Sequence, residues 1–92
     1  MAFVGQPEKS AYDFDHGRVN FYAEHNGSPV KCAVSEEAIQ DLAQSLTSDG
    51  EELLELFRSN QNIFVAIAEE KFLARNVELD GYVVVKSADL AR

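Results

Sequence analysis

Tryptophan is absent from the 92-residue chain, cysteine occurs once, and eight lysines and arginines stand against sixteen acidic residues. A single cysteine excludes a disulfide within the chain and agrees with a reducing compartment. The net charge of −8 disfavours nucleic acids and anionic membranes as partners, because both are bound through lysine and arginine. No apolar run approaches the roughly 20 residues that cross a bilayer, and the first ten residues lack the features of a signal peptide. We therefore expect a cytoplasmic protein that contacts neither nucleic acid nor membrane.

The composition is otherwise that of an ordinary globular domain. Hydrophobic residues make up 46% of the chain and charged residues 26%, so neither general disorder nor a membrane protein is indicated. No internal repeat or linker divides the sequence. We expect one domain over residues 1–92, with residues 1–11 loosely ordered and a compact core over about residues 12–87.

Two segments on either side of Asn26-Gly27 have the alternating pattern of paired β-strands. "RVNFYA" and "PVKCAV" place apolar side chains at every second position, and Asn-Gly is the favoured pair for a two-residue type I′ turn. This turn fixes the register of the hairpin and puts the apolar residues of both strands on one face. The predicted apolar pairs are Val19 with Val34, Phe21 with Cys32, and Ala23 with Val30.

Pro29 indicates where the hairpin has a free edge. Its missing N–H costs no bond within the hairpin but would cost one to a strand on the other side, so we expect that end of the second strand to be unpaired. The valine run at residues 83–85 predicts a buried final strand. We expect this strand to pair with the first strand of the hairpin. The second strand is then an edge, and the chain is a monomer or a weak homodimer that forms through that edge.

A helix is predicted directly after the hairpin. Ser35 is placed to cap "EEAIQDLAQSL", and two glutamates stand in its first turn, where the helix dipole favours acids. Its apolar stripe predicts the burial of Ala38, Ile39, Leu42 and Leu46.

Further helices follow a break at "TSDG". A capping box from Ser48 to Glu51 or from Asp49 to Glu52 starts "EELLELFRS". Residues 51–75 form one helix or two, and we prefer a break at residues 59–60. The expected fold is therefore α+β: a β-hairpin, two or three helices and a C-terminal strand, with a small antiparallel or mixed sheet packed on the helices.

The motifs together resemble a known family. Tyr12-Asp13, the hairpin "NGSPVKCAVSEEA" and the later series Phe57-x-x-Asn60-x-x-Ile63 are similar to domain of unknown function 1488, a family of short bacterial proteins. The resemblance covers roughly residues 12–87 and implies a small bacterial, cytoplasmic α+β protein. It implies no activity and no functional residue.

Three features of the sequence could suggest catalysis or metal binding, and each has a simpler interpretation. Cys32 points into the predicted core, where a thiol has a raised pKa and low reactivity. "YDFDHG" places two aspartates and His16 together, but glycine stands where a calcium loop needs a third oxygen ligand, so we interpret it as a polar turn. His25 lies at the hairpin tip, too far from Cys32 for a catalytic dyad. We predict no catalytic residue, no metal site and no cofactor.

Acidic residues gather in the first two predicted helices, and Lys71 and Arg75, one turn apart, form a small basic spot on the third. A solvated face is the simpler interpretation of such an acidic run, and a docking surface for a basic partner is the other. The candidate interaction surface consists of Glu36, Glu37, Asp41, Glu52, Glu55 and Pro29.

Our first hypothesis is a small acidic, non-enzymatic binding or regulatory module that acts through a protein partner, for which a basic protein is one candidate. The alternative is a small-ligand-binding protein or minor enzyme. Its pocket would lie between the helices and the sheet, with Tyr12, His16 or His25 at the rim.

Overall fold

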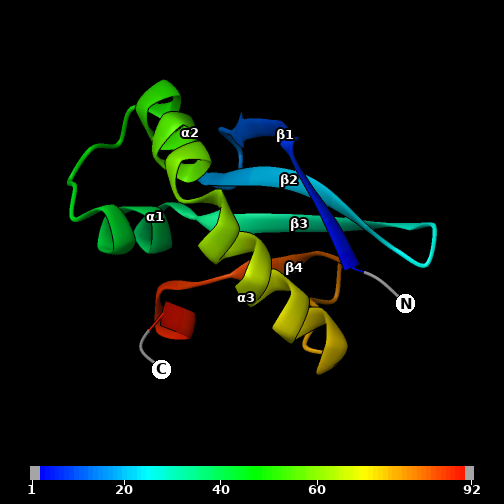
Figure 1. Cartoon of the computed structure of the whole chain (residues 1–92). Helices are drawn as coiled ribbons and strands as arrows, with labels where there is room; N and C mark the ends of the chain where they lie inside the picture. Colours follow the sequence, from blue (N-terminus) through cyan, green and yellow to red (C-terminus); the bar gives the residue numbers. More distant parts are fainter. Residues whose placement is uncertain (1–2, 91–92) are drawn as a thin grey trace.

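The computed structural model describes residues 3–90 as a four-stranded sheet with helices packed on it (Figure 1). The elements in order are β1 (Phe3–Asp13), β2 (Arg18–His25), β3 (Ser28–Ser35), α1 (Glu36–Ala43), α2 (Gly50–Ser59), α3 (Gln61–Leu73), β4 (Val83–Val85) and a 3-10 helix, η1 (Ser87–Leu90). The strand order across the sheet is β1-β2-β3-β4. The predicted α+β class, with a hairpin, helices and a final strand in a mixed sheet, is confirmed.

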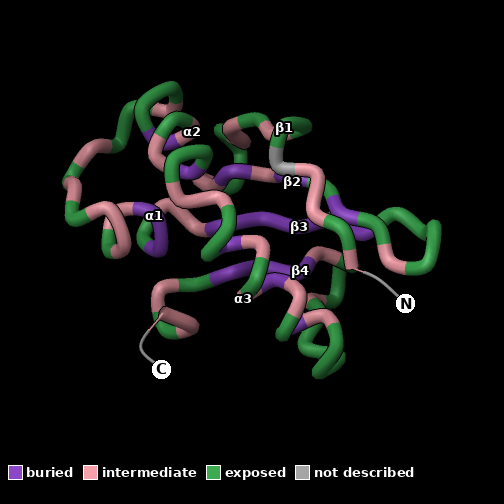
Figure 2. The backbone as a smooth tube through the Cα atoms, viewed as in Figure 1, coloured by how far each residue is buried: buried purple, intermediate pink, exposed green. Residues whose placement is uncertain are grey.

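The β2–β3 hairpin has the register that its turn predicts. Asn26 and Gly27 both have positive φ, 54° and 83°, as a type I′ turn requires. The three predicted apolar pairs all form, and every one of their side chains is buried (Figure 2). The hairpin therefore supplies the inner face of the sheet.

The pairing of β4 differs from the prediction. β4 pairs in parallel with β3, from Cys32 opposite Val83 to Val34 opposite Val85, and not with β2. β2 is not available, because β1 occupies its other side. Within residues 3–90, the β4 ladder does not reach Pro29, so the prediction that this end of β3 is unpaired is confirmed.

The expectation that the chain is loosely ordered before residue 12 is wrong for residues 3–11, which belong to β1. Residues 1 and 2 lie outside the described residues. β1 pairs with β2 on both sides of an irregularity, where the register shifts between Gln6 and Ala11. Gly5 lies so close to α3 that a Cβ there would stand 2.6 Å from Cγ1 of Val65. This segment is held in place by contacts with residues that are distant in the chain. Local sequence patterns do not reveal such contacts.

The core lies between the inner face of the sheet and the three helices. Figure 2 shows the buried positions concentrated along β2, β3 and β4 and on the inward sides of the helices. Phe57 links the layers, since its ring centroid lies 5.2 Å from that of Phe21 and 5.8 Å from that of Phe64. All three rings are almost fully buried.

The helix caps explain where α1 and α2 begin and end. Ser35 Oγ accepts a hydrogen bond from Ala38 N at 3.1 Å, which confirms the predicted cap of α1. Asp49 caps α2 by accepting from Glu51 N at 2.9 Å.

α1 ends at Ala43, and Gln44 takes the left-handed conformation with φ 54°. The predicted burial of Leu46 is therefore wrong: the chain has left the helix, and Leu46 is 95% exposed.

Residues 51–75 form two helices, with the break at the preferred place. Asn60 lies between α2 and α3 with φ −118°, and its side-chain amide donates to the carbonyl oxygen of Leu56 at 2.9 Å. The change of direction at Asn60 brings Phe57 and Phe64 together in the core.

Candidate functional site

The acidic residues of the candidate interaction surface differ in how far they are engaged in the fold. Glu37 and Glu55 are exposed. Glu36 is half-buried and accepts a hydrogen bond from the hydroxyl of Tyr12 at 3.1 Å. The carboxylate of Asp41 accepts from Ser87 Oγ, which ties α1 to η1. Glu36 and Asp41 therefore contribute to the fold as well as to the surface charge.

The structure divides that surface into separate parts. Glu52 and Glu55 line a shallow cavity of about 350 Å³, where Glu52 accepts from the hydroxyl of Thr47. Asp41 lines a different cavity at the α1–η1 side. Pro29 lies near the hairpin tip, at the opposite end of the sheet from α1 (Figure 1). Pro29 is therefore not continuous with the acidic residues.

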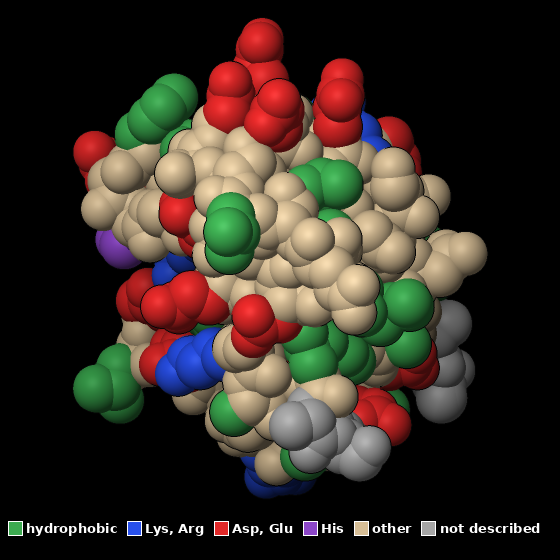
Figure 3. Space-filling view, turned by 90° about the vertical axis from the view of Figure 1, so that its left-hand side faces the viewer, with side chains coloured by type: hydrophobic (Ala, Val, Ile, Leu, Met, Phe, Trp, Pro, Cys, Tyr) green, Lys and Arg blue, Asp and Glu red, His purple; other side chains and the backbone are tan. Residues whose placement is uncertain are grey.

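An apolar groove runs between α1, α3 and η1. Two adjoining cavities of about 420 and 450 Å³ share Leu42 and Leu90, and Ile63 and Ile67 of α3 line the first of them. Ile63 is 45% exposed. Three carboxylates line the same cavities: Asp41, Glu70 and Asp89. Figure 3 shows this side of the molecule, with acidic side chains along its upper border and hydrophobic side chains gathered lower on the same face.

The "YDFDHG" segment is a hydrogen-bonded turn. Asp13 accepts from the backbone N–H groups of Asp15 and His16 and from Asn20 Nδ2, and its Oδ2 lies 2.9 Å from His16 Nδ1. The bond from Asn20 is the main cause that holds the pKa of Asp13 below its ordinary value. In residues 3–90, no group of three or more acidic, histidine or cysteine side chains is placed to hold a metal ion.

Cys32 is fully buried on the inner face of β3, as predicted. Burial raises the pKa of its thiol to about 12, because the apolar core disfavours the thiolate. A buried thiol that stays protonated at neutral pH is a poor nucleophile.

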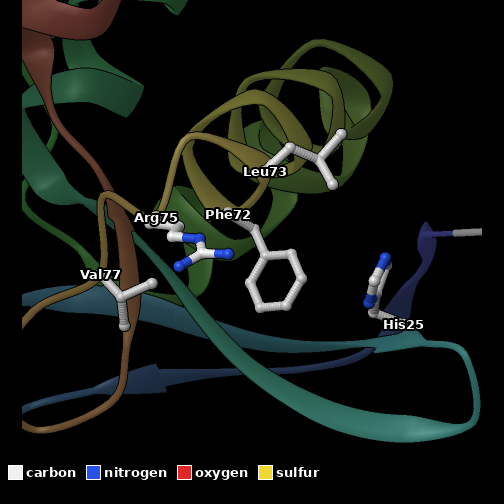
Figure 4. A pocket seen from close by; sticks show the side chains of 5 residues that line it. All are labelled: His25, Phe72, Leu73, Arg75 and Val77. Carbon is white, nitrogen blue, oxygen red and sulfur yellow. The ribbon is translucent and has the colours of Figure 1, made fainter.

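A cavity of about 470 Å³ lies where α3 ends beside the β2–β3 hairpin (Figure 4). It is lined by His25, Phe72, Leu73, Arg75 and Val77. The ring centroids of His25 and Phe72 are 5.0 Å apart. Figure 4 shows the guanidinium of Arg75 and the imidazole of His25 on opposite sides of the Phe72 ring. The cavity therefore combines an apolar floor with two nitrogen-bearing side chains.

The residues expected at the rim of a ligand pocket do not lie together. His25 lines the cavity at the end of α3, whereas Tyr12 bonds to Glu36 and His16 to Asp13 near the start of α1. Partial burial, together with the bond to Glu36, raises the pKa of Tyr12.

The predicted basic spot on α3 is also divided. Lys71 is buried and its ammonium bonds to Val84 and Asp89, whereas Arg75 is exposed and lines the cavity. The sequence marks Arg75 only as part of the basic spot and does not single out Phe72 or Val77, because the strand that completes their cavity is distant in the chain. The one local signal is "LARN", a helix end without the glycine that usually follows it.

The family model described as "Protein of unknown function (DUF1488)" matches residues 6–85. The chain belongs to the DUF1488 family. A search of curated proteins finds no match. A crystal structure of a DUF1488-family protein of unknown function from Shewanella loihica PV-4 is similar, with 19% sequence identity, 90% of each chain covered and a TM-score of 0.83. At this identity the likeness shows that the DUF1488 fold is shared, and no more.

No helix in the described part of this DUF1488 chain combines the length and the apolar character needed to span a membrane.

Proposed function

We propose that this protein acts in the cytoplasm as a small acidic, non-enzymatic binding module, and that the groove between α1, α3 and η1 holds a segment of a protein partner. The observation that carries the proposal is the composition of the groove. Leu42, Ile63, Ile67 and Leu90 offer an apolar floor, and carboxylates stand beside it.

The chemistry of the groove selects the kind of partner. Contact between apolar side chains of a partner and Ile63 with its neighbours stabilises the complex, since exposed apolar surface is removed from water. Lysine or arginine next to those side chains complements the carboxylates, and the net charge of −8 steers such a segment toward the protein. We therefore propose a partner segment that presents apolar residues flanked by basic ones.

The test compares two variants that add the same carboxylate at two exposed apolar side chains. Ile63→Glu places the charge in the groove, and Leu79→Glu places it on a fully exposed residue that lines none of the described cavities of the groove. Both variants are expected to melt near the wild-type temperature, because neither side chain belongs to the buried core. Each protein is used to capture partners from a lysate of the source organism, and mass spectrometry identifies what is bound.

The expected result is a protein retained by the wild type and by Leu79→Glu but lost by Ile63→Glu, with a cross-linked segment that contains apolar and basic residues. Asp41→Asn is expected to weaken this capture at low salt, because it removes the charge and preserves an acceptor for Ser87. Glu37→Lys reverses a charge on the exposed side of α1. It tests whether a charge that does not line the groove also contributes to the electrostatic attraction of the partner. Identical capture by the wild type and Ile63→Glu would overturn the proposal.

A further inference from the structure

The cavity at the end of α3 carries an inference that is independent of partner binding in the groove. We propose that the cavity lined by His25, Phe72, Leu73, Arg75 and Val77 binds a small organic anion with an aromatic or similarly flat apolar group. The anionic group is a carboxylate or a phosphate, which share the chemistry that a guanidinium recognises.

The floor of the cavity suits the apolar part of such a ligand. The ring of Phe72 contacts two other rings, with centroids 5.0 Å from His25 and 5.7 Å from Phe3. Leu73 at the rim is 58% exposed, and Val77 is also exposed. A flat apolar group inserted over Phe72 would remove this surface from water and contact an aromatic ring already fixed in position.

Arg75 suits the anionic part. Among residues 3–90 its guanidinium makes no ion pair, although the chain has twice as many acidic as basic residues. Figure 4 shows it beside the Phe72 ring, opposite His25. A guanidinium offers paired N–H donors to a carboxylate or phosphate, so a ligand over Phe72 would meet charge and apolar contact in one place.

The backbone at Arg75 supplies a second, independent argument. Arg75 has φ 61°, the left-handed conformation that follows a helix end and that glycine adopts most easily. Arg75 N donates to Phe72 O at 3.0 Å and Asn76 N to Lys71 O at 2.8 Å, so backbone groups already satisfy these carbonyls. The guanidinium is not needed to complete the helix end. The chain thus places an arginine where glycine would be less strained, and this arginine borders the cavity.

A different role for Arg75 makes a different prediction. A cation near a helix C-terminus interacts favourably with the helix dipole, and this role requires no ligand. If that were its whole role, an organic anion would bind no better than its neutral analogue. The ligand proposal requires that binding depend both on the charge of the ligand and on Arg75.

The first experiment is a titration followed by ¹H–¹⁵N NMR spectra of the full chain. The probes are phenylacetate and phenyl phosphate, with phenylacetamide as the neutral analogue. We expect phenylacetate or phenyl phosphate at millimolar concentrations to shift the resonances of the cavity residues and phenylacetamide to bind at least about tenfold more weakly. The stronger of the two anions identifies the preferred group. Equal binding of all three probes, or no shift in the cavity, would overturn the proposal.

The second experiment compares Arg75→Gly with Gln44→Gly. Gln44 also occupies a left-handed position at a helix end, with φ 54°, but does not line this cavity. Both variants are expected to raise the melting temperature, because glycine relieves the same kind of strain. Arg75→Gly should weaken binding of the anionic probe by about tenfold or more, and Gln44→Gly should leave it unchanged. Wild-type affinity in Arg75→Gly would overturn the proposal, and the raised melting temperature shows that any lost affinity does not come from unfolding.

Discussion

The ammonium of Lys71 lies 2.7 Å from the carboxylate of Asp89, and the side chain of Lys71 is only 8% exposed. The same ammonium donates to the carbonyl oxygen of Val84 at 2.7 Å. One side chain of α3 therefore holds both β4 and η1. Within residues 3–90, β4 has three residues and one neighbouring strand, so this attachment supplements a short ladder.

Replacement of Lys71 by methionine is expected to lower the free energy of unfolding by about 2–3 kcal/mol. The variant retains the length of the side chain but leaves Val84 O without this donor and Asp89 without the buried cation. Urea unfolding followed by circular dichroism measures the change. Lys9→Met, at an exposed lysine, is the control and should stay within about 0.5 kcal/mol of the wild type. Equal stability of the two variants would show that the bonds of Lys71 contribute little.

Cys32 is expected to resist thiol reagents in the folded protein. Its pKa of about 12 leaves almost no thiolate at pH 8, and its side chain is fully buried. Reaction with a disulfide reagent should be many-fold slower for the native protein than for the protein in urea. Equal rates would contradict the buried position.

The same shift predicts a loss of stability in alkali. The pKa of Cys32 is higher in the folded than in the unfolded chain, so the unfolded chain releases the thiol proton first as pH rises. The contribution of Cys32 is fully present below its ordinary pKa of about 9 and is lost progressively as pH rises toward 12. Cys32→Ala should lose less stability than the wild type between pH 8 and pH 10, as urea unfolding at each pH can measure.

Asp13 is expected to act at the other end of the pH range. Its pKa is lowered chiefly by the hydrogen bond from Asn20, so the carboxylate stabilises the fold above its ordinary pKa and this stabilisation disappears as pH falls through the folded value. In Asn20→Ala, NMR titration should show the pKa of Asp13 moved upward. Asn62→Ala, at an exposed asparagine, should leave it unchanged.

Gly50→Ala is expected to destabilise the fold although Gly50 lies in α2, where alanine is ordinarily favoured. A Cβ at this position would stand 2.7 Å from Cδ2 of Tyr12. The ring would have to move, which strains its bond to Glu36, and we expect a loss of about 1–3 kcal/mol in the free energy of unfolding. In a Tyr12→Ala background the same change should be neutral or stabilising, because the clash is gone.

The sequence predicts those parts of the fold that short-range chemistry determines. Asn26-Gly27 sets the register of the hairpin, and Ser35 marks the start of α1, because each acts on residues within one turn. Such patterns could predict neither β1 nor the strand with which β4 pairs. Contacts between residues distant in the chain decide which strand lies beside β2. The acidic residues were recognised by charge alone, whereas the groove at Ile63 and the cavity at Arg75 exist only once helices and strands are packed.

The parallel pairing of β3 with β4 has a consequence for how the chain folds during synthesis. The connection from Ser35 to Val83 contains all three helices, so the edge of β3 at residues 32–34 stays without its neighbour until residues 83–85 have been made. Loop closure over so long a connection is slow compared with formation of the hairpin. A ribosome-bound nascent chain therefore exposes an apolar strand edge that β4 later covers. In a cell that lacks early-acting chaperones, chains truncated before residue 83 should aggregate more readily than chains that contain β4.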